Sequence, residues 1–88
     1  MPELCRFEGM TIQMRFADNV QHHKPHVHVR CGEYKASVSL EGELLAGELP
    51  YKKLILLQSW MILREKELYN AWHNAVREIP FDKIDPIK

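Results

Sequence analysis

The residues best suited to chemistry are four histidines that lie close together, His22, His23, His26 and His28. Imidazole titrates near neutral pH, so it serves as an acid–base catalyst and as a metal ligand. Pro25 interrupts the cluster, and because proline donates no backbone hydrogen bond it suits the first position of a strand. We therefore expect His22 and His23 on a loop, and His26 and His28 on the strand that follows it.

An alternating pattern begins directly after Pro25, which is typical of a half-buried strand. Val27, Val29 and Cys31 fall on one face of this segment, and His26, His28 and Arg30 fall on the other. Gly32-Glu33 predicts a two-residue hairpin turn into a returning strand over 34–40, and residues 10–16 alternate in the same way. The outward faces of these three strands should form one surface.

That expected surface contains no carboxylate. Its members are Thr11, Gln13, Arg15, His26, His28, Arg30, Lys35, Ser37 and Ser39. Arginine and lysine neutralise phosphate, and hydroxyl and amide groups hydrogen-bond to it, so the surface suits an anionic ligand. A set of nine positions with none of the 12 acids is only mildly improbable by chance, so the observation carries moderate weight. Polar side chains are also ordinary on the solvent side of a sheet.

Three functions remain open on these residues. In the first, His26 and His28 are the general base and acid of a metal-independent ribonuclease, His22 closes over the site, and Arg15, Arg30 and Lys35 bind phosphate. In the second, His22, His26 and His28 ligate a divalent transition metal such as zinc. In the third, the surface binds RNA or an acidic partner protein and performs no chemistry.

The strands and helices expected from the sequence, which must position these residues, indicate an α+β fold in a single domain, residues 1–88. We expect a small antiparallel sheet of three to four strands within 4–46, and a helical region over 50–77 packed on its apolar face. One straight helix of that length would span about 42 Å, against roughly 30 Å for a domain of this size. The sequence therefore favours a kink or break near 64–67, although a straight helix reaching a partner subunit is also open. We expect residues 79–88 to form an extended tail whose apolar side chains dock on the domain, and a frayed terminus is equally open for the last four residues.

Composition narrows the class of protein. The 88 residues carry 12 basic and 12 acidic side chains, which argues against a protein that coats nucleic acids or membrane surfaces through its net field. Two cysteines make no disulfide scaffold. Residues 1–10 have no apolar signal-peptide core, and the longest apolar run, 54–57, is too short to span a bilayer. We expect a cytoplasmic protein with no membrane partner, and a homodimer remains open.

Several segments together resemble a known family. They are residues 1–14 (MPELCRFEGMTIQM), the His-x-x-Pro-His-x-His pattern of 22–28, the Gly-Glu-Leu-Pro of 47–50, and the helical residues Trp60 and Trp72. Over essentially the whole chain they resemble the bacterial domain-of-unknown-function family 4160, whose loop usually reads His-Asn-Pro-Pro-His-x-His. His23 and Lys24 depart from that motif and make the loop more basic. The resemblance implies a small cytoplasmic prokaryotic protein, commonly encoded beside a small cognate protein of unknown-function family 2442 in a toxin–antitoxin-like pair.

Overall fold

The protein folds as five strands followed by two helices, and the computed structural model describes residues 3–14 and 24–86. The strands are β1 (Glu3–Phe7), β2 (Met10–Gln13), β3 (His26–Cys31), β4 (Tyr34–Ser39) and β5 (Leu44–Gly47), and the helices are α1 (Tyr51–Leu63) and α2 (Glu65–Val76). The α+β class is confirmed. Among the described residues, neither helix is long and apolar enough to cross a membrane.

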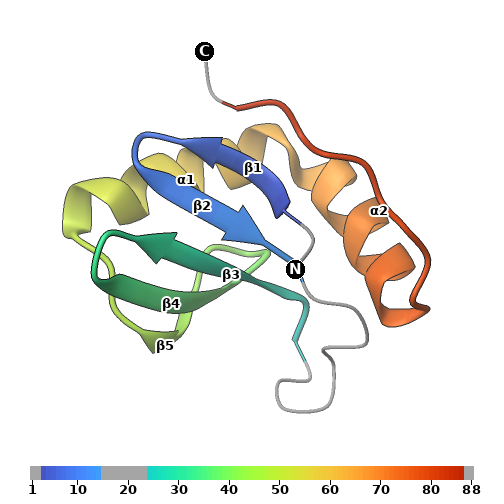
Figure 1. Cartoon of the computed structure of the whole chain (residues 1–88), viewed down its shortest axis with the longest axis horizontal. Helices are drawn as coiled ribbons and strands as arrows, with labels where there is room; N and C mark the ends of the chain where they lie inside the picture. The colour runs from blue at the N-terminus through green and yellow to red at the C-terminus, as the bar shows by residue number, and fades with distance from the viewer. Residues whose placement is uncertain (1–2, 15–23, 87–88) are drawn as a thin grey trace.

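The strands form one antiparallel sheet in the order β1-β2-β3-β4-β5, so that each strand pairs with its neighbour in sequence (Figure 1). Thr11 pairs with Arg30, and Arg30 pairs with Lys35. Gln13 likewise pairs with His28, which pairs with Ser37. Because paired residues in adjacent strands point to the same face, these two rows of polar side chains lie side by side on one surface.

The expectation of three to four strands was too low, since the described residues form five. Irregular pairing makes the two edge strands, β1 and β5, difficult to recognise from alternation in the sequence. A register shift in β1 falls between Glu3 and Cys5, and both Leu4 and Cys5 are buried. A second shift between Ser37 and Val38 interrupts the pairing of β4 with β5. Such bulges are common at sheet edges, and they break the alternation by which a strand is recognised.

The helical region is two helices rather than one, with the break in the segment where the charges predicted it. Arg64 leaves the helical conformation at φ −114° and ψ 22° and separates α1 from α2. Figure 1 shows α1 behind the sheet and α2 to one side of it. The buried residues of α1 are Leu57, Trp60 and Met61, and they join the inward side chains of the strands in one core.

The described part of the C-terminal segment returns to the domain through Ile84, whereas Ile79 is exposed. The backbone N–H of Ile84 donates to the carbonyl of Leu4 at 2.7 Å, and the Ile84 side chain is buried. Trp60 Nε1 donates to the carbonyl of Asp85 at 2.7 Å, and Arg64 Nε donates to the same oxygen at 3.2 Å. The segment is therefore held against β1, α1 and the helix break.

Candidate functional site

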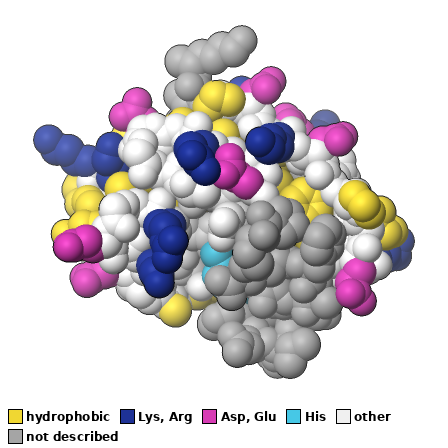
Figure 2. All heavy atoms as spheres, in the orientation of Figure 1, with side chains coloured by type: hydrophobic (Ala, Val, Ile, Leu, Met, Phe, Trp, Pro, Cys, Tyr) yellow, Lys and Arg dark blue, Asp and Glu magenta, His cyan; other side chains and the backbone are white. Residues whose placement is uncertain are grey.

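A groove of about 590 Å³ lies on the face of the sheet that points away from α1, and all five strands contribute to it. The polar residues that line it are Glu3, Arg6, Thr11, Gln13, His28, Arg30, Lys35 and Ser37. The viewer of Figure 2 sees this face, with Lys and Arg side chains around a histidine surface near its centre. The alternation of β2, β3 and β4 produces the groove, because their apolar residues point into the core.

The groove carries two opposed cations. Arg30 and Lys35 are direct cross-strand partners, and both are exposed. Like charges in such a pair destabilise a sheet. The ion pairs between described residues involve neither of them. Two adjacent positive charges that no described carboxylate pairs with form a surface that an anion would stabilise.

The prediction of an acid-free surface was wrong, because β1 adds Glu3 to the groove. Glu3 is neutralised locally, since Arg6 Nη2 donates to its Oε1 at 2.9 Å. Arg6 pairs with Thr11 and therefore extends the row that contains Arg30 and Lys35. The described part of the groove thus holds three cations and one carboxylate.

Arg6 and Glu3 are the groove residues that sequence reasoning missed. Because the start of β1 is irregular, the sequence did not indicate which of its side chains point to the groove. The local order Cys5, Arg6, Phe7 does alternate, and it places Arg6 opposite two apolar neighbours. That three-residue alternation was the signal available in the sequence, and it was too short to fix a strand face without the pairing partner.

His28 is the strand histidine that reaches the groove. It is half-buried, and its Nδ1 lies 3.4 Å from Ser37 Oγ on the neighbouring strand. A hydrogen bond of this length is weak, but it orients the ring. Ser37 was expected on the exposed surface, whereas it is only 8% exposed and forms part of the groove floor.

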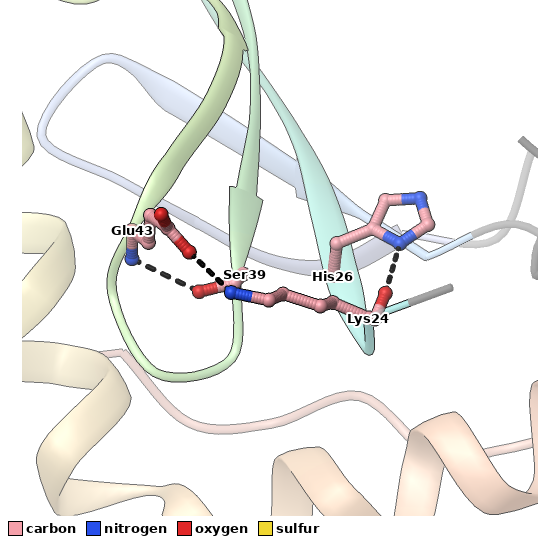
Figure 3. A network of polar contacts seen from close by, with 4 residues as sticks. All are labelled: Lys24, His26, Ser39 and Glu43. Carbon is pink, nitrogen blue, oxygen red and sulfur yellow. Dashed lines mark hydrogen bonds and ion pairs between the residues drawn. The ribbon is translucent and has the colours of Figure 1, made fainter. Parts of the chain in front are cut away.

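His26 lies on the same side of β3 as His28 but is 1% exposed, which corrects the expectation that it belongs to the solvent face. Its ring lies between two others, with centroids 5.1 Å from Trp72 and 5.2 Å from His28. Its Nδ1 donates to the carbonyl of Lys24 at 2.8 Å, which fixes the proton on that nitrogen (Figure 3). His26 is therefore not among the described residues that line the groove, and its ring contacts His28, which is.

The segment before β3 is anchored to the turn between β4 and β5 (Figure 3). Lys24 Nζ lies 2.7 Å from Glu43 Oε1, and the hydrogen bond to this carboxylate raises the pKa of Lys24. The backbone N–H of Glu43 donates to Ser39 Oγ at 3.0 Å. Ser39, which was also expected on the solvent face, is 1% exposed because it holds this turn. These contacts fix the start of the strand that carries His26 and His28.

The remaining predicted site residues, Arg15 and His22, lie outside the described residues, as does His23. Their proposed roles stay predictions. Within the described residues, no group of three His, Cys, Asp or Glu side chains is arranged to hold a metal ion. The alternative zinc site requires His22 beside His26 and His28, so it also stays a prediction.

Comparison with known proteins gives a family and no function. No curated protein and no solved structure matches the chain. A family model described as a domain of unknown function, DUF4160, matches residues 9–73, which run from the β1–β2 turn into α2 and include the strand histidines. The match covers most of the 88 residues, and the chain therefore belongs to the DUF4160 family.

Proposed function

We propose that the groove binds the phosphate backbone of RNA, and that the protein works in a toxin–antitoxin-like pair with a small cognate protein encoded nearby. The observation that carries the proposal is the opposed pair Arg30 and Lys35, exposed and without a described carboxylate partner. Arginine binds two phosphate oxygens at once and lysine acts as a point charge, so the pair suits a phosphodiester.

The composition of the groove favours contact with the backbone rather than with bases. Among the described residues that line it there is no Phe, Tyr or Trp, the side chains on which unpaired bases stack. Thr11 and Gln13 supply neutral hydrogen-bonding groups beside the cations. Binding of this kind depends strongly on salt and weakly on sequence.

The proposed chemistry, where RNA is cut, belongs to His28. A 2′-hydroxyl attacks the neighbouring phosphorus when an imidazole removes its proton, and the 5′-oxygen leaves when it gains one. In this proposal His28 exchanges one of these protons, and the cations stabilise the charge that develops on the phosphate. His26 acts as a positioning residue behind His28, and His22 remains the candidate for the second proton.

Salt-dependent binding tests the proposal. A labelled single-stranded RNA of mixed sequence is titrated with wild-type protein and with the Arg30→Ala/Lys35→Ala variant, by fluorescence anisotropy at several salt concentrations. Each phosphate contact contributes about 0.7 to the slope of log affinity against log salt, so the double variant should lose about 1.4.

The matched control is Lys66→Ala/Lys83→Ala, which removes the same charge from exposed positions outside the groove. This variant should bind RNA as the wild type does. Equal losses in the two double variants would show that net charge rather than the groove binds RNA, and would contradict the proposal.

Co-expression with the neighbouring gene's product then tests the pairing, because a cognate partner should co-purify with the protein and relieve any growth inhibition.

A further inference from the structure

The solvent face of α1 is unusually apolar. Tyr51 is 76% exposed, Ile55 41%, Ile62 77% and Leu63 64%. At about 100° per residue, Tyr51, Ile55 and Ile62 lie within roughly 40° of one another on the helix surface, and Leu63 lies about 80° or more away from them. We call Tyr51, Ile55 and Ile62 the α1 outer stripe. The opposite side of the helix already packs on the core through Leu57, Trp60 and Met61.

A helix that is apolar on both sides belongs between two layers of protein. Single exposed apolar residues are ordinary, but three aligned on one face of a 13-residue helix form a patch of the kind that marks an interaction surface. The sheet covers one side of α1, and the stripe is what a second layer would cover.

We propose that a second copy of this chain covers the α1 outer stripe, with the two α1 helices antiparallel about a twofold axis. Charge complementarity identifies the occupant. The first turn of α1 carries Lys52 and Lys53 and no acid, while Glu65 and Glu67 follow directly after its last turn, one on each side of Lys66. An antiparallel pair brings each Lys52 to the end of the partner helix where these carboxylates lie. The twofold axis repeats this contact at the other end of the interface.

The neighbouring charges support this arrangement. Lys53 is engaged within its own copy, since its Nζ donates to the carbonyl of Glu8 at 2.7 Å. Arg64 is likewise directed to the C-terminal segment, where it donates to the carbonyls of Asp85 and Pro86. Lys52 is therefore the first-turn cation left to face a partner. Ser59, an exposed small residue one turn after Ile55, lies about 40° to the side of it around the helix. Its small side chain lets the two helices approach closely beside the stripe.

The dimer leaves the proposed RNA groove open, because α1 and the groove lie on opposite sides of the sheet (Figure 1). The two grooves of a dimer would then face away from the twofold axis. A helix of 13 residues spans only about 20 Å, so the interface is small and the dimer should dissociate on dilution. Dimerisation does not depend on the function proposed for the groove.

Sedimentation equilibrium of the full chain over a range of concentrations tests the interface. Ile55→Glu buries a charge in the stripe and should raise the dimer dissociation constant on the order of tenfold or more. The matched control is Ile79→Glu, because Ile79 is exposed to a similar degree, 44%, but lies on the C-terminal segment. Circular dichroism and thermal melts establish that both variants fold. A wild-type chain that stays monomeric at every concentration, or equal effects of the two variants, overturns the proposal.

A charge exchange tests the antiparallel geometry. Lys52→Glu alone and Glu65→Lys/Glu67→Lys alone should each weaken the dimer, because each places like charges at both ends of the interface. The combination of all three substitutions should restore it. Weakening without restoration would show that the stripe packs in another orientation or against another protein, and would overturn the arrangement proposed here.

Discussion

Arg30 and Lys35 face each other across β3 and β4, next to the turn that joins the two strands. A cross-strand pair of like charges costs stability, on the order of 0.2–1 kcal/mol. A domain of this size has a small margin, about 0.05–0.15 kcal/mol per residue. The pair therefore lowers the stability of the fold at a position where most other residue pairs would raise it. Such a concentration of positive charge is what a binding surface for an anion requires.

Lys35→Glu should separate stability from binding. It converts the repulsive pair with Arg30 into an attractive one, so the free energy of unfolding should rise by about 0.5 kcal/mol. RNA affinity should fall, because one phosphate ligand is replaced by a carboxylate. Urea denaturation and fluorescence anisotropy measure the two effects. Lys35→Gln removes the repulsion without adding attraction, so both of its values should lie between those of wild type and Lys35→Glu. A variant that is more stable and binds RNA equally well would exclude Lys35 from the site.

The two strand histidines should respond differently to substitution. His26→Ala removes a ring that packs on Trp72 and leaves the Lys24 carbonyl without its donor, so we expect a loss of about 2–3 kcal/mol in urea denaturation. His28→Ala removes a ring that is only half-buried and whose contact with Ser37 Oγ is long, so it should cost less than His26→Ala, about 1 kcal/mol.

RNA cleavage and binding should depend more on His28 than on His26, the opposite of the order expected for stability. His28→Ala should abolish RNA cleavage while the protein stays folded. His26→Phe, which keeps a ring against Trp72, should still bind RNA as the wild type does. If His28→Ala cuts RNA at the wild-type rate, the chemistry proposed for the groove is wrong, although the binding proposal for Arg30 and Lys35 would stand.

The sequence predicted the parts of this protein that follow a simple period. Alternation placed Val27 and Val29 in the core and put His28 and Arg30 together on the opposite face. It could not predict that His26 is buried, because burial depends on Trp72, which lies far along the chain and reaches His26 only after the helices pack. The side of the sheet to which a residue points is set locally by the alternation of its strand. The exposure of that residue depends on which other elements pack on that side.

The same distinction explains the remaining differences. The charged segment after Leu63 predicted a helix break, and Arg64 provides it, because interruption of an apolar stripe is a local signal. The contribution of β1 was missed because its register shift disrupts the alternation, and only pairing with β2 reveals that Arg6 faces the groove. Long-range pairing cannot be read from a five-residue segment alone.

Glu78→Gly should stabilise the protein. Glu78 has a φ of +58° at the end of α2, where its N–H donates to the carbonyl of Ala75 and the N–H of Ile79 donates to that of Asn74. This helix ending favours glycine at the left-handed position, and a residue with a Cβ is strained there by about 1 kcal/mol. Thermal and urea denaturation should show a gain of that size. Glu78→Ala is the control, because it removes the carboxylate but keeps the Cβ, and it should recover only a small part of the gain.

Cys5 should make the protein less stable at alkaline pH. Burial raises the pKa of its thiol above the ordinary value of 9.0, so the folded state holds the proton more tightly than the unfolded state does. The stabilisation is therefore complete below about pH 9 and is lost as the pH rises through that value toward the folded pKa. Lysines and tyrosines also titrate in this range, so the measurement is the difference between wild type and Cys5→Ala in urea denaturation from pH 7 to 10.5. That difference should shrink with rising pH, and a constant difference would show that the thiol is not desolvated. Cys31, which is less buried than Cys5, should react faster with a thiol reagent in the folded protein.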